Sequence, residues 1–240
     1  MKQNAVQRFT TTQWSVVLGA KDMTSASAQA ALEQLCSRYW YPLYAYVRRR
    51  GCSLHEAQDL TQGFLADLLN RNAIESVHPN KGRFRSFLIA SLNHFLSNER
   101  DRARAGKRGG GIQPVFLDQE RAEERFRNEP VTDDTPEKIY DRKWALTVLA
   151  RAKERLRDEY ALAGKKEKFD SLWPIINQDD LRTYAEVAKA MGTTGSAIKN
   201  EVPRMKQRYL EMVRNEVAQT IGSLADLDDE LQYLMIAVGR

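Results

Sequence analysis

The chain has 240 residues, of which 42% are hydrophobic, enough to bury a core in one or two domains. Its 37 Lys and Arg against 32 Asp and Glu give a net charge of +5, which permits a polyanionic partner without requiring one. Cys36 and Cys52 are too few and too far apart to suggest a metal site, and no apolar run approaches the roughly 20 residues of a membrane span. We therefore expect a cytoplasmic protein with reduced thiols and no secretion signal.

The first long predicted helix runs from about Ala28 to the arginine run at residues 48–50. Apolar residues recur along it at the three- and four-residue spacing of one helical face. We expect Pro42 to kink or split this helix and Gly51 to take the position after its end. The arginine run is compatible with phosphate contact, but a solvated helix end, where cations offset the helix dipole, is the favoured interpretation.

A second helix is predicted to begin at a capping box formed by Ser53 and Glu56. Opposite its apolar stripe lies a polar but partly small face made of Asp59, Gln62, Gly63, Ala66 and Asn70. Such a face would let another helix approach closely, although periodicity alone favours an ordinary solvated surface.

A third helix is predicted over residues 84–105. Opposite its apolar stripe, polar residues at i, i+4, i+7 and i+11 form one line along the helix: Asn93, Ser97, Arg100 and Arg104. Between Arg100 and Arg108 the chain holds five cations and one anion. A basic cluster at a helix end is typical of phosphate contact, and a solvated charged end is the alternative.

Residues 118–137 invert the charge, with eight acids, three arginines and a net charge of −5. A glycine triplet precedes this stretch and prolines interrupt the region, so we predict a linker over residues 109–136, with a short helix near residues 119–127. The linker would separate a first domain at residues 1–108 from a second at residues 137–240. Its acidity would disfavour DNA binding along it, or let it shield a basic face of the free protein.

Residues 183–214 are predicted to form a helix-turn-helix. Gly192 ends the first helix, and Thr193, Thr194 or Ser196 caps the second. The polar face of the second helix comprises Ser196, Lys199, Asn200, Pro203, Arg204 and Gln207. Such a helix can lie in the major groove of DNA; the alternative is a helical hairpin with a solvated basic face. Pro203 should bend it, at a cost of about 3 kcal/mol in a regular helix.

The rest of the pattern is also helical, including a helix after Gly222 for which packing is favoured over a regulatory role. The predicted fold class is therefore all-α, with two helical domains. The three histidines lie in separate segments without partners at metal-ligand spacing. The sequence contains no phosphate-binding loop, dinucleotide fingerprint or nucleophile elbow. We therefore expect no enzyme activity, no metal and no cofactor.

Four segments carry a resemblance to a known family: YPLYAYVRRRG at residues 41–51, EAQDLTQGFLADLL at 56–69, FRSFLIASLNHFLSNER at 84–100, and the helix-turn-helix at 184–209. In this order they resemble regions 2 and 4 of bacterial RNA polymerase sigma factors of the extracytoplasmic-function (ECF) class. The first two segments look like the opening helices of region 2, and the third looks like the promoter-melting helix. A helix-turn-helix alone is common, whereas the ordered combination is specific.

The resemblance implies promoter-specific transcription initiation, with the chemistry left to the polymerase. It places the docking site for the β′ coiled coil of core RNA polymerase at Asp59, Gln62 and Asp67. The β flap, promoter DNA and an anti-sigma factor are further candidate partners. The −10 element would be read and opened by Asn93, Ser97, Arg100 and Arg104. The −35 element would be read by Ser196, Lys199, Asn200, Arg204 and Gln207.

Three positions depart from the family pattern. Ser97 stands where the family often has an acid and Leu92 where it often has arginine, so the −10 sequence preference stays open. Pro203 lies within the recognition helix. The main alternative is a stand-alone helix-turn-helix regulator, which would normally dimerise on a palindrome and need no polymerase. A helical adaptor that binds only protein is a further alternative.

Overall fold

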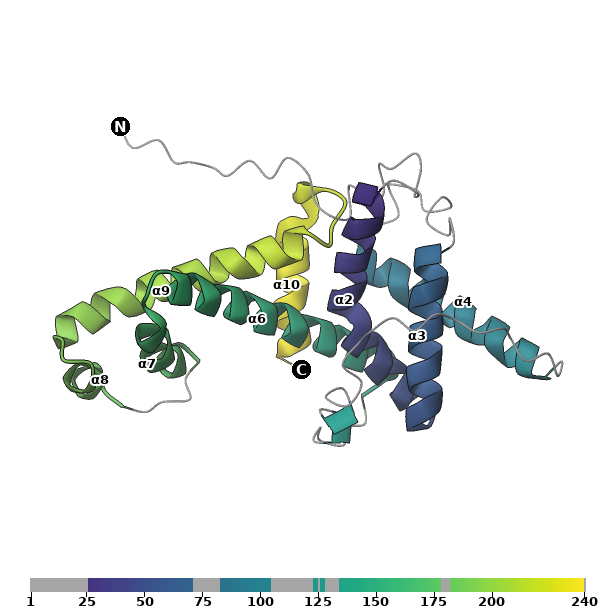
Figure 1. Cartoon of the computed structure of the whole chain (residues 1–240), viewed down its shortest axis with the longest axis horizontal. Coiled ribbons are helices and arrows are strands. Elements are labelled where there is room, and N and C mark those ends of the chain that lie inside the picture. Colours follow the sequence, from purple (N-terminus) through teal and green to yellow (C-terminus); the bar gives the residue numbers. More distant parts are fainter. Residues whose placement is uncertain are drawn as a thin grey trace. The chain divides into compact units, whose positions relative to one another are not determined.

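The computed structural model describes residues 26–70, 83–104, 123–124, 126–127, 134–177 and 182–239. Within these ranges the regular structure is entirely helical and no strand occurs, so the predicted all-α class is confirmed (Figure 1). Most of the predicted linker at residues 109–136 lies outside the described residues. None of the described helices is both long and apolar enough to cross a membrane.

The chain divides into two compact units. Unit 1 comprises Met1–Thr147 and Val217–Arg240, and unit 2 comprises Val148–Glu216. The division therefore falls inside α6 (Pro136–Leu162) and α9 (Gly195–Ala218). It differs from the predicted one, in which residues 137–240 form a single domain, because both ends of that segment pack within unit 1.

Unit 1 is built around α2 (Ala26–Arg49), which packs against α3 (Leu54–Asn70). Every residue of α2 from 39 to 47 is buried, as expected for a helix that lies inside a core rather than on its surface. The helix continues through Pro42, so the predicted split is wrong, whereas the kink stays a prediction. Gly51 follows the helix with φ of 88°, a conformation that favours glycine.

The predicted capping box opens α3. The Ser53 backbone N–H donates to Glu56 Oε2 at 2.9 Å, and the Glu56 N–H donates to Ser53 Oγ at 3.4 Å. The next helix, α4 (Phe84–Arg104), buries Phe84, Leu88 and Leu92 at the predicted spacing.

A buried arginine near the start of α4 connects three helices. Arg85 Nε donates to Glu230 Oε1 of α10 (Leu227–Val238) at 2.7 Å, and Arg85 Nη1 donates to Asp141 Oδ1 of α6 at 3.0 Å. Its Cζ lies 3.8 Å from the ring centroid of Tyr233. Arg83 Nε pairs with the second oxygen of Glu230 at 2.7 Å. Because Glu230 is 0% exposed and Arg85 7%, loss of either residue would leave the other buried with one charged partner, Asp141 for Arg85 and Arg83 for Glu230.

Further contacts fix the same helices. The Phe84 N–H donates to the Thr220 carbonyl at 3.1 Å, and the Tyr140 hydroxyl donates to the Arg85 carbonyl at 3.1 Å. After the short 3₁₀ helix η2 (Leu224–Asp226), α10 buries Leu234 beside these groups. The terminal helix is thus part of the unit 1 core, which confirms the packing role predicted for it.

Unit 2 contains the second part of α6, then α7 (Lys166–Ile176), α8 (Tyr184–Ala190) and most of α9. The buried carboxylate of Glu216 pairs with Arg151 at 3.3 Å and Arg155 at 2.7 Å. Trp173 of α7 meets Tyr209 of α9 edge to face, with ring centroids 5.0 Å apart. These contacts attach α9 to α6 and α7.

Glu230→Ala should lower the free energy of unfolding by about 3 kcal/mol, because it leaves Arg85 buried with only Asp141 to compensate its charge. Urea unfolding followed by circular dichroism measures the loss. Asp229→Ala removes the same charge from an exposed position of α10 and should cost at most about 1 kcal/mol. Equal losses in the two variants would contradict the assigned role of the buried pair.

Candidate nucleic-acid interface

The predicted polar line of α4 lies away from the buried stripe of that helix. Ser97, Arg100 and Arg104 are exposed, and Asn93 is half-buried. Asn93, Ser97 and Arg100 come together at one pocket, whereas Arg104 lies one turn further along, at the end of α4. The structure thus brings three of the four predicted −10 residues to a common site.

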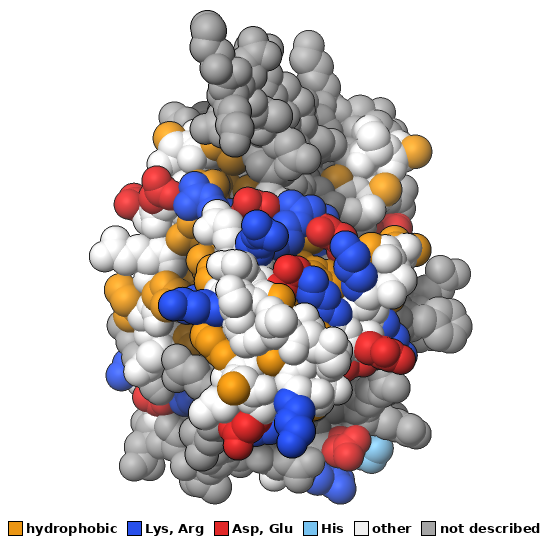
Figure 2. Space-filling view, turned by 90° about the vertical axis from the view of Figure 1, so that its left-hand side faces the viewer, with side chains coloured by type: hydrophobic (Ala, Val, Ile, Leu, Met, Phe, Trp, Pro, Cys, Tyr) orange, Lys and Arg blue, Asp and Glu red, His pale blue; other side chains and the backbone are white. Residues whose placement is uncertain are grey.

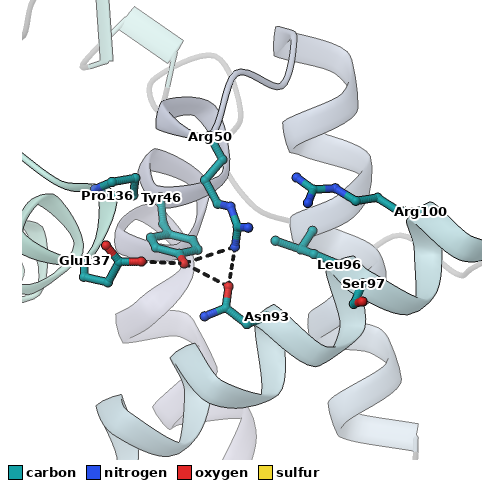
Figure 3. A pocket seen from close by; sticks show the side chains of 8 residues that line it. All are labelled: Tyr46, Arg50, Asn93, Leu96, Ser97, Arg100, Pro136 and Glu137. Atoms are coloured by element: carbon teal, nitrogen blue, oxygen red, sulfur yellow. Dashed lines mark hydrogen bonds between the residues drawn. The ribbon is translucent and has the colours of Figure 1, made fainter.

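This pocket has a volume of about 500 Å³ and lies where α2, α4 and the start of α6 meet (Figure 3). It combines an aromatic ring, an amide, a hydroxyl, a carboxylate and two guanidinium groups, from Tyr46, Asn93, Ser97, Glu137, Arg50 and Arg100. Figure 3 shows Arg50 and Asn93 turned toward each other across it. Because the Tyr46 ring is buried, the donors and acceptors of this hollow are the groups that can recognise a polar ligand.

The amide of Asn93 is oriented by two donors, one on α2 and one on the residue that directly follows this helix. The Tyr46 hydroxyl donates to Asn93 Oδ1 at 2.8 Å, and Arg50 Nη1 donates to the same oxygen. Tyr46 also lies 3.1 Å from Glu137 Oε1, so its single hydroxyl proton is shared between two acceptors. Burial raises the pKa of Tyr46 further above neutral pH, where a tyrosine hydroxyl already holds its proton. With Oδ1 occupied, the amide nitrogen of Asn93 can still donate toward a ligand.

Local hydrogen bonds build the helix-turn-helix as predicted. Thr183 and Glu186 form a capping box at the start of α8, and Gly192 takes φ of 62° in the turn. Among the three predicted caps for α9, Thr194 is used: its Oγ1 accepts from the Ala197 N–H at 3.2 Å. Gly195 lies close to α8, since a Cβ at this position would be 3.9 Å from the Ala185 Cα. The turn therefore holds the start of α9 against the first helix of the motif.

The polar face of α9 points to solvent while its apolar stripe is buried. Ile198, Val202 and Met205 are buried. All five predicted −35 residues are exposed: Ser196, Lys199, Asn200, Arg204 and Gln207. Figure 2 views the molecule from the side on which α8 and the start of α9 lie, and shows Lys and Arg side chains interspersed with acids and uncharged groups.

Charged residues of α9 fall into two sets. Arg208 donates to both oxygens of Glu159 on α6, at 3.0 Å and 2.7 Å, and these bonds hold the pKa of Glu159 below its ordinary value. Lys168 of α7 pairs with Glu201 at 2.7 Å. In contrast, no described residue forms an ion pair with Lys199 or Arg204 in the structure. The first set attaches α9 to its unit, and Lys199 and Arg204 are left to contact an anion.

On α3, the predicted polymerase-docking residues differ in exposure. Asp59 is exposed, while Gln62 and Asp67 are half-buried. Gly63 and Ala66, which were expected to admit a partner helix, are buried instead. The small residues of this face thus serve the packing of unit 1, and the surface for a partner is reduced to the polar side chains.

Sequence reasoning missed Tyr46, Arg50 and Glu137 as parts of the pocket. Tyr46 lies on α2 and Arg50 directly follows this helix, so the four-residue spacing between them was visible in the sequence. Nothing in the sequence indicated that this face meets Asn93, 47 residues beyond Tyr46. Glu137 was assigned to the start of a separate domain.

Comparison of the chain with models of protein families, with curated proteins and with solved structures finds no match. Among the described residues, no group of three or more His, Cys, Asp or Glu is placed to hold a metal ion. The site is therefore interpreted from its own geometry.

Pro203 lies inside α9, which runs through it as one helix; the predicted bend stays a prediction. Pro203→Ala restores a donor to the Lys199 carbonyl and should raise the free energy of unfolding by about 1–3 kcal/mol, after allowing for the more flexible unfolded chain. Gln207→Ala, an exposed change one turn later, should alter it by less than about 0.5 kcal/mol. Urea titration tests both; an unchanged or lower stability of Pro203→Ala would show that α9 already accommodates the proline without cost.

Proposed function

We propose that this chain is a bacterial RNA polymerase sigma factor of the ECF class. It binds core polymerase, recognises the −10 and −35 elements of promoters and aids the melting of DNA. The proposal rests on the resemblance of four ordered segments, and the geometry of α4 and α9 supports it. The observation that carries it beyond a generic helix-turn-helix protein is the pocket at Asn93.

A regulator that only docks a helix in duplex DNA has no use for such a pocket. Bases of single-stranded nucleic acid, once unstacked, are recognised by aromatic faces and by hydrogen bonds to their edges. Asn93 and Glu137 offer an amide donor and a carboxylate acceptor at one place, and the buried Tyr46 orients the Asn93 amide through its hydroxyl group. Arg50 and Arg100 add positive charge for the neighbouring phosphates. We infer that a base of the opened −10 strand binds here.

In the proposed complex α9 enters the major groove at the −35 element. Lys199 and Arg204 are suited to the O6 and N7 acceptors of guanine, and Asn200 and Gln207 to the N6 and N7 groups of adenine. Contacts with phosphates fix the position of the protein along the duplex, and contacts with base edges determine which sequence is bound. Asp59, Gln62 and Asp67 are proposed to bind the β′ coiled coil, and the helix-turn-helix to contact the β flap.

Reconstituted transcription tests the proposal. The purified chain is mixed with core polymerase and a library of promoter fragments, and specific initiation is scored by transcript sequencing. A sigma factor restores initiation at a defined sequence. A stand-alone regulator binds duplex DNA without core polymerase and does not restore initiation, and a protein-binding adaptor does neither. Either of the last two results would refute the proposal.

Arg204→Ala should weaken binding of the reconstituted holoenzyme to a −35 duplex by about 1–3 kcal/mol. If Arg204 also neutralises a phosphate, the slope of log K against log salt should fall by about 0.9. Arg157→Ala removes the same charge from an exposed position of α6 in the same unit and should change neither quantity. Fluorescence anisotropy at several salt concentrations measures both. Equal effects of the two substitutions would indicate a non-specific charge effect.

A further inference from the structure

The C-terminal end of α2 is not the solvated helix end that its sequence favoured. We call Arg48 and Arg49, its last two residues, the arginine end. Both are half-buried. Arg48 Nη1 donates to the Cys52 carbonyl at 2.7 Å, which orients its guanidinium group. A positioned arginine pair at a helix end is suited to binding an anion rather than only to solvation.

A carboxylate from the predicted linker occupies the arginine end. Residues 123, 124, 126 and 127 are helical (Figure 1), and Glu123 and Phe126 contact α2. Arg48 donates from Nε to Glu123 Oε2 at 3.4 Å and from Nη2 to Oε1 at 3.3 Å. Tyr44 donates its hydroxyl to Glu123 Oε2 as well, and Arg127 Nε donates to Oε1 at 3.2 Å. Glu123 is 6% exposed, so a charged group is held deep in this contact.

The aromatic ring of Phe126 also packs against the arginine end. The Cζ atoms of Arg48 and Arg49 lie 4.7 Å and 5.0 Å from the Phe126 ring centroid, within the range of cation–π attraction. Tyr44 meets the same ring edge to face at 6.3 Å. Glu123 and Phe126 together cover the arginine end; we call these two residues the linker latch.

We propose that the arginine end of α2 is a binding site for nucleic-acid phosphate, and that the linker latch occupies it in the free chain. The two oxygens that Glu123 presents to the Nε and Nη2 edge of Arg48 match the way a phosphate group binds a guanidinium. The Phe126 ring stands where an unstacked base could lie on an arginine plane. Arg50, the next residue along the chain, lines the Asn93 pocket.

This inference rests on the proposed function, because it requires the chain to bind nucleic acid. It adds that the linker competes with that ligand, so the chain alone binds DNA less tightly than its charges allow. Release of the latch, when DNA or core polymerase displaces Glu123 and Phe126, would expose Arg48 and Arg49 to phosphate.

The test compares two substitutions in the full chain that each replace a glutamate by the uncharged glutamine. Glu123→Gln removes the carboxylate from the latch, and Glu124→Gln removes the same charge from the exposed neighbouring residue. The probe is fluorescein-labelled oligo(dT) of about 20 nucleotides, long enough for one binding groove. Glu123→Gln should bind it about fivefold more tightly than wild type at low salt. Its salt slope should steepen by about 0.7 for one more phosphate contact.

Glu124→Gln should stay close to wild type, and adding Arg48→Ala to Glu123→Gln should abolish the gain. Phe126→Ala provides a second route to an open latch if Glu123→Gln impairs folding, which circular dichroism reports. Equal gains in Glu123→Gln and Glu124→Gln, or no gain in either latch variant, would overturn the proposal. A gain in affinity for core polymerase without one for oligo(dT) would also overturn it.

The same variants in reconstituted transcription separate this inference from the proposed function. Wild-type initiation with no gain in the latch variants would refute the latch alone. A gain for oligo(dT) with no initiation by any variant would refute the sigma-factor proposal and leave the phosphate site standing.

Discussion

The packing of unit 1 depends on how the buried charge of Arg85 is compensated. A guanidinium removed from water must have anionic partners, and here they come from Asp141 of α6 and Glu230 of α10. The two acids lie 56 and 145 residues away in the sequence. Forming these pairs therefore brings the start of α6 and the C-terminal helix to the first turn of α4. The Tyr233 ring and the neighbouring Arg83 complete the compensation.

This constraint also positions the candidate site. Glu137 and Asp141 are one helical turn apart on α6, so the turn that pairs with Arg85 also brings Glu137 to the pocket at Asn93. The first half of α4 is fixed by buried contacts, and the second half carries the exposed Ser97, Arg100 and Arg104. A rigid base with a polar, basic extension is suited to presenting side chains to a strand of DNA.

In unit 2, some charged residues form ion pairs within the unit, and others remain exposed to solvent. Glu159 and Glu216 pair with arginines inside the unit, and α9 is held by Arg208. Lys199 and Arg204, on the outer face, take no part in such pairs among the described residues. The number of cations along α9 does not show which of them are paired within the unit. Only the cations that are not paired there are available to contact an anionic ligand.

Local features could be predicted from the sequence, and long-range ones could not. The capping boxes at Ser53 and Thr183 and the exposed face of α9 follow from spacing of a few residues. Glu230 sits on an amphipathic helix, where a glutamate normally indicates the solvent side; its burial is explained by its ion pairs with Arg83 and Arg85. The arginine end of α2 was predicted to be solvated because its partner, Glu123, lies 75 residues away from Arg48. Gly63 and Ala66 were expected to face a partner helix and instead pack within the unit.

We propose that α4 opens the −10 element while α9 holds the −35 element. Permanganate reactivity of promoter thymines, measured with core polymerase and this chain, tests it most directly, because permanganate attacks unpaired thymines. The account predicts reactive thymines at the −10 element with the wild-type chain. Asn93→Ala should lose this reactivity and keep protection of the −35 element, whereas Arg204→Ala should lose the −35 protection. Unchanged −10 reactivity in Asn93→Ala, or no opening with the wild-type chain, would contradict the account.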